Sequence, residues 1–166
     1  GHKVVVVDDL STGKMENLNP NAQFFNIDLR DKDALEEVFQ NSKPEIIYHI
    51  AAQIDVRKSV ADPAFDASVN ITGSINLFEL AVKYNVRRII FSSTGGALYG
   101  EPENLPASED TLVVPLAPYG VSKYCTEQYL NYFKRMYGIE RVILRYANVY
   151  GPRQDPLGEA GVIAIF

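Results

Sequence analysis

The chain has 166 residues, of which 46% are hydrophobic and 22% charged, a composition typical of one soluble globular domain with a sizeable core. Its formal net charge of -5 argues against general nucleic-acid binding, which usually needs a basic surface. The apolar runs are shorter than the roughly 18 residues of a membrane span, and no signal-peptide pattern is present. The single cysteine, Cys125, cannot form an intramolecular disulfide. We therefore expect a cytoplasmic protein without nucleic-acid or membrane partners.

Apolar runs of strand length alternate with helical patterns, which predicts a parallel sheet covered by helices on both faces. Strands are predicted at 3–8, 23–27, 45–50, 88–92 and 141–146, and helices at 31–41, 63–84 and 118–137. The four consecutive valines of the first strand suit a fully buried position. The polar, proline-containing segment 102–118 predicts a long surface loop, a kind of segment that is often functional.

Tyr119 and Lys123 lie four residues apart in the last predicted helix, and this spacing places them on one face. A fixed ammonium stabilises phenolate over phenol, so we expect it to lower the tyrosine pKa from about 10. Tyr119 can then act as an acid and base on a substrate hydroxyl. Thr94, near a strand end, is the expected hydroxyl partner, with Ser92 and Ser93 as alternatives. Taken alone, the spacing also fits an exposed helical pair.

Acidic and small residues follow three predicted strands, at the edge where open α/β sheets bind ligands. Asp8 and Asp9 are placed to accept hydrogen bonds from an adenosine ribose, which favours NAD over NADP. The alternative is a turn over 9–13 that uses aspartate and serine for turn chemistry. Asp28 is placed to face the adenine, to cap the next helix, or to do both. The segment 51–53 either admits a cofactor closely or packs tightly.

Two asparagines are further candidates, and the histidines are not. Asn70 interrupts the apolar side of helix 63–84, so we expect it to bond the backbone of a neighbouring strand unless it lies at the surface. Asn148 follows the fifth strand and is either a substrate contact or a turn residue. His2 and His49 have no ligand cluster of suitable spacing around them, so no metal is expected.

Five segments occur in a telling order: 8–13, 49–53, 92–100, Tyr119-x-x-x-Lys123 and 144–151. Together they resemble the extended short-chain dehydrogenase/reductase superfamily, in its NAD-dependent nucleotide-sugar epimerase and dehydratase branch. The resemblance covers essentially the whole chain, and 93–100 is most similar to UDP-glucose 4-epimerases. Sugar-nucleotide 4,6-dehydratases typically carry an Asp-Glu pair where this sequence has Gly95-Gly96, which removes the acid needed for water elimination.

The resemblance implies a Rossmann-like, doubly wound parallel sheet that lacks its first βα unit and most of the C-terminal substrate lobe. Residues 1–152 would form a partial NAD-binding domain, and 153–166 would begin the substrate-binding region. Without the glycine-rich phosphate loop, we expect the 166-residue chain alone to bind NAD poorly and to be inactive. A homodimer through helices 63–84 and 118–137 is implied for the full-length protein.

The implied activity is epimerisation at C4 of a nucleotide sugar of the UDP-glucose type, through a transient 4-keto sugar, with NAD regenerated. Tyr119 would exchange the proton of the 4-hydroxyl, Lys123 would bond the nicotinamide ribose, and Thr94 would bond the reacting oxygen. Asn148 would contact the nucleotide sugar, with Thr94 and Tyr119. The alternatives are another nucleotide-sugar reductase or decarboxylase, or a non-catalytic NAD-binding regulator. The implied NAD contacts are Asp8, Asp9, Leu10, Ser11, Thr12, Gly13, Asp28, Leu29, Ile50, Ala51, Ala52, Gln53, Asn70, Tyr119 and Lys123.

Overall fold

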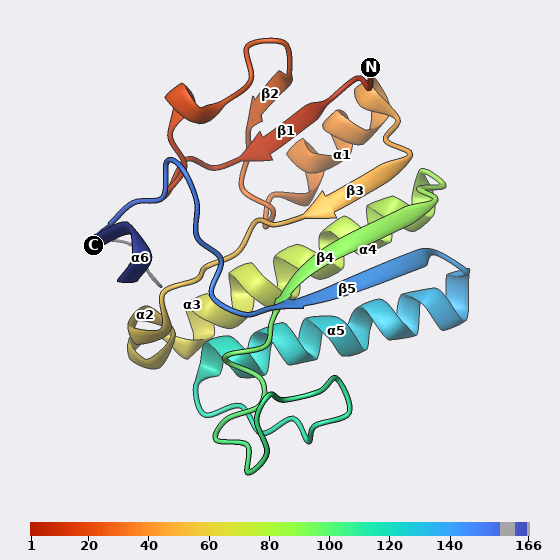
Figure 1. Cartoon of the computed structure of the whole chain (residues 1–166). Helices are drawn as coiled ribbons and strands as arrows, with labels where there is room; N and C mark the ends of the chain where they lie inside the picture. Colours follow the sequence, from red (N-terminus) through yellow and green to blue (C-terminus); the bar gives the residue numbers. More distant parts are fainter. Residues whose placement is uncertain (157–161, 166) are drawn as a thin grey trace.

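The computed structural model describes residues 1–156 and 162–165 and confirms a parallel α/β fold (Figure 1). The strands are β1 (Val5–Asp8), β2 (Gln23–Asn26), β3 (Ile46–His49), β4 (Arg88–Thr94) and β5 (Glu140–Tyr146). The helices are η1 (Met15–Asn17), α1 (Lys32–Ser42), α2 (Val56–Ala61), α3 (Pro63–Ala67), η2 (Ser68–Thr72), α4 (Gly73–Lys83), α5 (Pro118–Tyr137) and α6 (Val162–Ile165). Every predicted strand and helix is present, with ends within two residues of those expected.

The strands form two parallel groups, β1–β2 and β3–β4–β5. Val5 pairs with Gln23 in the first group, and Ile46 pairs with Arg88 in the second. Among the described residues, β1 and β3 are not paired with each other. The strand of the first βα unit, which the resemblance implies for the full-length protein, would lie between them, and this stays a prediction.

The helices α1, α4 and α5 all lie on one face of the strands (Figure 1). Burial alternates accordingly along the strands: Ile89 and Phe91 of β4 are buried, whereas Tyr48 of β3 is 67% exposed. Helices over both faces are therefore not seen in the described part of the chain, because right-handed crossovers that progress in one direction pass over the same face. The expected full burial of the valines is also wrong, since Val4 is 51% exposed and the others are half-buried.

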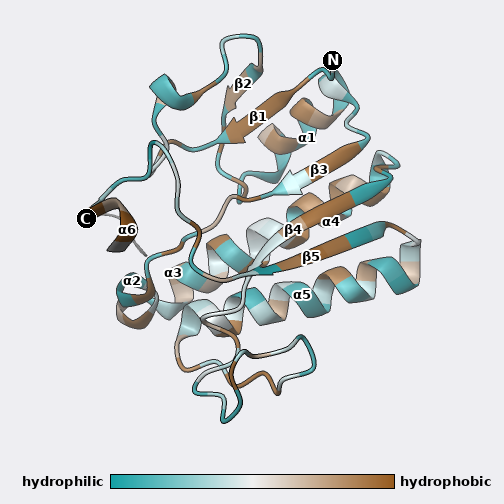
Figure 2. Ribbon diagram, in the orientation of Figure 1, coloured by the Kyte–Doolittle hydropathy of each residue, from teal (hydrophilic) through white to brown (hydrophobic). Residues whose placement is uncertain are grey.

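The core joins the helix layer to β4. Phe78 of α4 and Phe133 of α5 pack edge to face with 5.6 Å between ring centroids, and Ile89 and Phe91 lie in the same cluster. Each such side chain stabilises the fold by about 1.5–3 kcal/mol. Figure 2 shows that the strands are mainly hydrophobic and that β3 and β4 turn paler toward their carboxyl ends. The core thus holds α4 and α5 against strands whose carboxyl ends are polar.

Local signals explain where the helices begin and end. Asp31 caps α1 by accepting a hydrogen bond from Ala34 N (3.1 Å). Pro118 opens α5, and Gly138 ends it in the left-handed conformation at φ 76°. Among the described residues, no helix has the length and apolarity needed to cross a membrane.

Candidate active site

The carboxyl ends of the five parallel strands gather the predicted site segments at one edge of the fold (Figure 1). Residues 9–13 follow β1, 28–29 follow β2, 50–53 follow β3, Thr94 ends β4, and Asn148 follows β5. Open parallel sheets bind ligands at this edge. The fold therefore brings together residues that are far apart in sequence.

Gly120 lets the start of α5 approach the loop after β4. A Cβ atom at Gly120 would lie 2.4 Å from the carbonyl oxygen of Ala97, a distance that a side chain cannot occupy. The backbone N–H of Ala97 in turn donates to Thr94 Oγ1 (3.2 Å). Gly120, the neighbour of Tyr119, and Thr94 thus both contact Ala97. The pairing of the Tyr119 and Thr94 hydroxyls stays a prediction.

The two alternative hydroxyls have other surroundings. Ser93 is buried and donates to Glu127 Oε1 at 2.5 Å. Glu127 also accepts from Arg145 Nε (3.0 Å) and Nη2 (2.7 Å), and this pairing raises the pKa of Arg145. Ser92 lies within the strand, so Thr94 is the hydroxyl at the strand end.

Lys123 is an almost completely buried ammonium, 3% exposed, in the second turn of α5. Its Nζ lies 4.6 Å from the centroid of the Phe91 ring, a cation–π contact, and donates no hydrogen bond within the described part of the chain. Burial lowers the pKa of Lys123 to about 8, against the opposing charges of Asp66 and Glu127. The ammonium therefore has unused donors close to the carboxyl edge.

Tyr119 does not have the lowered pKa that the sequence predicts. Burial raises the pKa of the half-buried phenol, and the negative charge of Asp66 raises it further. The expectation failed because helical spacing says nothing about desolvation, which penalises the phenolate. The negative charge that opposes ionisation of Tyr119 belongs to Asp66 on α3, whereas Tyr119 lies on α5.

Asn70 performs the backbone contact expected of it. Its Oδ1 accepts from Gln53 N (2.9 Å), and its Nδ2 donates to Gln53 O (2.9 Å), just beyond β3. Asn70 is 3% exposed, so the surface alternative is wrong. Asp66 Oδ1 completes the cluster by accepting from Gln53 Nε2 (2.9 Å) and Asn70 Nδ2 (3.0 Å). These contacts fix the segment 51–53.

The Asn70 carbonyl connects three elements. It accepts from Ser74 Oγ (2.6 Å) on α4 and from Thr126 Oγ1 (2.9 Å) on α5. Because the Ser74 hydrogen is used in this way, His49 Nε2 must donate to Ser74 Oγ at 2.7 Å, which defines the tautomer. Asn70 sits in the π-helix η2, a geometry often found at functional sites.

The aspartates after β1 form the turn proposed as their alternative role. Asp8 Oδ1 accepts from Leu10 N (2.7 Å), and Asp9 Oδ1 accepts from Ser11 N (2.9 Å). Leu10 has a φ of 57°, in the left-handed region. The second carboxylate oxygen of each aspartate makes no hydrogen bond within the described residues, so turn chemistry and ribose binding are compatible.

Asp28 is not the cap of the following helix, which is Asp31. Asp28 instead accepts from Arg30 N (2.8 Å) and Arg30 Nε (3.0 Å), and these bonds lower its pKa. Leu29 packs against the core and lies beside Gly73, where a Cβ atom would come within 3.1 Å of Leu29 Cβ. Asp28, an expected cofactor contact, thus forms an exposed ion pair with Arg30. Leu29, also an expected cofactor contact, packs against the core as well.

Ile50 and Asn148 are both exposed at the carboxyl edge. The segment that carries Asn148 runs along this edge toward β1, where Asp155 lies 3.5 Å from Lys14 (Figure 1). The predicted boundary at 152/153 falls in this segment, and 157–161 and 166 lie outside the described residues. The structure thus leaves the substrate role of Asn148 as a prediction.

Three residues of the site were missed from the sequence: Asp66, Glu127 and Arg145. Asp66 precedes Asn70 by four residues, and Glu127 follows Lys123 by four, so helical spacing marked both as neighbours of expected site residues. Arg145 carried no such signal, because its contact to Glu127 joins a strand to a helix.

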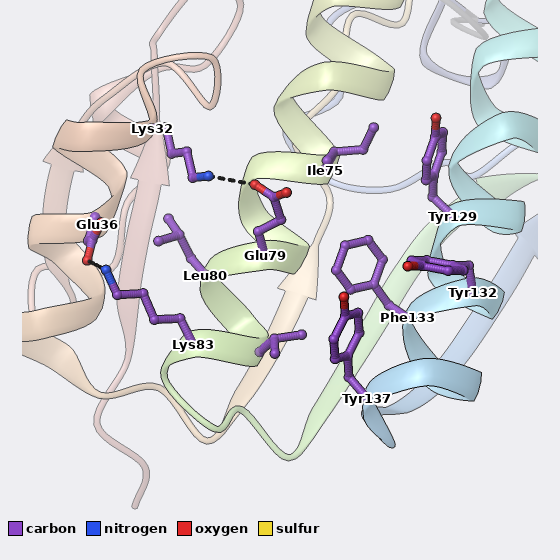
Figure 3. Close-up of a pocket in the computed structure, with 11 residues that line it drawn as sticks. Lys32, Glu36, Ile75, Glu79, Leu80, Lys83, Tyr129, Tyr132, Phe133 and Tyr137 are labelled. Carbon is purple, nitrogen blue, oxygen red and sulfur yellow. Dashed lines mark hydrogen bonds and ion pairs between the residues drawn. The ribbon is translucent and has the colours of Figure 1, made fainter.

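A separate hollow of about 470 Å³ lies on the helix layer, between α1, α4 and α5 (Figure 3). Aromatic side chains from α5 line one side, and Ile75 and Glu79 from α4 line the other. We call this surface the helix groove. Its aromatic residues are Tyr129, Tyr132, Phe133 and Tyr137.

The fold and site define a dinucleotide-binding α/β protein of the extended short-chain dehydrogenase/reductase type, with a Tyr-x-x-x-Lys helix at the carboxyl edge. The chain belongs to the NAD dependent epimerase/dehydratase family, whose profile matches residues 1–166.

Three of the similar proteins are described as UDP-glucose 4-epimerases, one of them as putative. A putative UDP-glucose 4-epimerase of Methanocaldococcus jannaschii is 52% identical over 165 residues, which are 99% of this chain and 54% of that protein. The UDP-glucose 4-epimerase of Thermotoga maritima, solved with UDP-glucose, is 53% identical with a TM-score of 0.96, over 99% of this chain and 54% of that one. The UDP-glucose 4-epimerase of Thermus thermophilus, solved in complex with NAD, is 49% identical with a TM-score of 0.94, over 98% of this chain and 52% of that one. The chain spans about half the length of these proteins.

Proposed function

We propose that the protein containing this chain interconverts UDP-glucose and its C4 epimer in an NAD-dependent reaction that passes through a transient 4-keto sugar. The observation that carries the proposal is the placement of Thr94, Tyr119 and the buried Lys123 at one carboxyl edge. The names of the similar proteins support the same reaction.

The residues present fit a dinucleotide. Lys123 offers unused donors for ribose hydroxyls, and the turn after β1 offers free carboxylate oxygens at Asp8 and Asp9. We assign the remaining contacts to Leu10, Ser11, Thr12, Gly13, Asp28, Leu29, Ile50, Ala51, Ala52, Gln53, Asn70 and Tyr119. When bound, NAD supplies a hydride acceptor that returns the hydride to the sugar. The 166-residue chain alone is expected to bind NAD weakly and to be inactive.

Tyr119 is the proton-transferring group in this proposal. It takes the proton of the sugar 4-hydroxyl as the hydride leaves C4. After the 4-keto sugar has rotated to present its other face, Tyr119 returns the proton to the same oxygen. Thr94 hydrogen-bonds the reacting oxygen, and Asn148 contacts the nucleotide sugar. Burial raises the pKa of Tyr119, so the base form requires a compensating positive charge at the site. A bound oxidised nicotinamide would supply such a charge.

We further propose that the full-length protein is a cytoplasmic homodimer joined through the helix groove. Tyr132 and Tyr137 are 40% and 53% exposed there. The charges at the groove are already paired within the chain, as Lys32 with Glu79 (2.5 Å) and Lys83 with Glu36. An aromatic surface whose charges are paired within the chain fits a second copy of itself better than a charged partner. Light scattering of the full-length protein and of Tyr132→Arg tests this: a dimer becomes a monomer, and a wild-type monomer refutes it.

The activity is tested by incubating the full-length protein with UDP-glucose and NAD. We expect epimerisation without accumulation of NADH, whereas a reductase or decarboxylase of the same branch would give a net redox change or release CO2. Tyr119→Phe should lower kcat by about 10²–10⁴-fold, the usual contribution of general acid–base catalysis. Unchanged turnover of Tyr119→Phe would remove the assignment, and absence of any turnover in the wild type would favour a non-catalytic NAD-binding regulator.

A further inference from the structure

Asp66 has an unusual position for a charged side chain. It lies on α3 with 0% exposure, and both of its hydrogen bonds, from Gln53 Nε2 and Asn70 Nδ2, go to Oδ1. Its Oδ2 is buried and has no hydrogen-bond partner. Burying an unpaired carboxylate oxygen is costly, so the position needs a compensating interaction.

The helix α3 packs against α5, whose first two turns carry Tyr119 and the almost completely buried ammonium of Lys123. The negative charge of Asp66 raises the pKa of both Lys123 and Tyr119. Two other titratable groups face Lys123: Glu127 on α5, which is neutralised by Arg145 of β5, and His49 on β3, which burial keeps uncharged. In the described part of the chain, α2, α4 and η2 contribute no further charge with an effect on this pair.

We propose that Asp66 is a positioning residue whose buried charge determines the protonation states of Tyr119 and Lys123. Oδ1 holds Gln53 and Asn70 in place, while the negative charge of the carboxylate favours the protonated forms of Lys123 and Tyr119. The inference deepens the proposed function and rests on Tyr119 as the proton-transferring group.

The orphan oxygen makes a clean variant possible. In Asp66→Asn, the amide nitrogen can replace Oδ2, which bonds to nothing, while the amide oxygen still accepts from Gln53 and Asn70. The variant therefore removes the charge and keeps the contacts. Asp62→Asn is the matched control, because Asp62 caps the same helix through Phe65 N (2.9 Å) and asparagine caps equally well.

The test measures the titration of Tyr119 in the full-length protein by NMR of ¹³Cζ-labelled tyrosine, with the resonance identified by its loss in Tyr119→Phe. We expect the Tyr119 midpoint to move to lower pH in Asp66→Asn and to stay in place in Asp62→Asn. The acid limb of the kcat profile should move in the same direction. A merely structural role for Asp66 would lower activity without moving either.

An unmoved Tyr119 midpoint in folded Asp66→Asn, or an equal movement in Asp62→Asn, overturns the proposal. If the amide variant does not fold, Asp66→Ser retains a small acceptor for Gln53 and should give the same downward movement. Asp66→Glu, which restores the charge, should bring the midpoint back toward the wild-type value. The titration needs no turnover, so it separates failure of this inference from failure of the proposed activity, which Tyr119→Phe reports.

Discussion

His49 should make the stability of the protein depend on pH, and His49→Gln should remove that dependence. The imidazole is 3% exposed, with Phe78 and Phe91 at ring distances of 6.0 and 5.3 Å. Its Nε2 donates to Ser74 Oγ, and the amide of glutamine can take over this donation without being able to titrate. Burial lowers the pKa of His49 from 6.5 to about 3, with the charge of Lys123 as a second cause.

The sign and size follow from proton linkage. Between pH 6.5 and about 3, the unfolded chain binds the proton that the folded chain refuses, so the free energy of unfolding falls as pH falls. The contribution is fully present above the unfolded pKa and is lost progressively below it. Each pH unit in this window is worth about 1.4 kcal/mol, so lowering the pH from 7 to 5 should cost the wild type about 2 kcal/mol through His49 alone.

Urea unfolding of full-length wild type and His49→Gln at pH 7 and pH 5 measures this difference. The loss of stability on acidification should be smaller in His49→Gln by about 2 kcal/mol. His2→Gln, at an exposed position near the N-terminus, is the control and should behave as the wild type. The same pH dependence in wild type and His49→Gln, or an NMR midpoint of His49 close to 6.5, would refute the reasoning.

Three further outcomes are expected. Gly120→Val should lower both the melting temperature and the turnover rate, because its Cβ would lie 2.4 Å from the carbonyl oxygen of Ala97. Gly96→Ala is the control and should change neither, because among the described residues nothing lies within 4 Å of its Cβ; equal effects of the two substitutions would contradict the prediction. Glu127→Ala should destabilise the fold by about 3 kcal/mol, because it removes the ion-pair partner of the part-buried Arg145, which within the described part of the chain keeps only its bonds to Tyr99 and Glu109, and the acceptor of buried Ser93. Adding Arg145→Leu should recover part of the loss in urea unfolding; no recovery would count against the lost ion pair as the cause. Adding NAD to the full-length protein should lower the pKa of Tyr119, measured by tyrosine NMR, because a positively charged nicotinamide ring favours phenolate. An unshifted Tyr119 midpoint would contradict the proposal that the nicotinamide binds beside Tyr119.

The strands and long helices were predictable because their signals are local. β1 contains three consecutive valines and β4 contains the apolar run Ile89-Ile90-Phe91, and α5 has a proline at its start and a glycine just after its end. The helix α2 was missed, because its six residues, VRKSVA, show no apolar period and it depends on the Asp55 cap, which accepts from Arg57 N (2.8 Å). The placement of helices on one face depends on crossover direction, which no local pattern encodes.

The candidate site divides in the same way. Asn70 could be predicted to bond a strand backbone, because a buried amide in an apolar helix must find partners. The direction of the Tyr119 pKa could not, because it depends on burial and on Asp66, which is 53 positions away in sequence and adjacent only after α3 packs on α5. The four-residue spacing placed Tyr119 and Lys123 on one helix, and the packing around Tyr119 decided the direction of its pKa shift.

Because of the π-helical turn η2, the number of residues in the continuous helical segment 63–83 is as important as their identity. The wider turn changes the rotational offset between α3 and α4, so that Asp66 is buried on α3, which packs on α5, while Phe78 lies in the core cluster with Ile89 and Phe91 of β4. Deleting one residue within 68–72 would restore a regular helix and rotate Asp66 by about 100° relative to Phe78, out of reach of its present neighbours. Insertions and deletions at this turn should therefore be selected against even where every individual substitution is accepted.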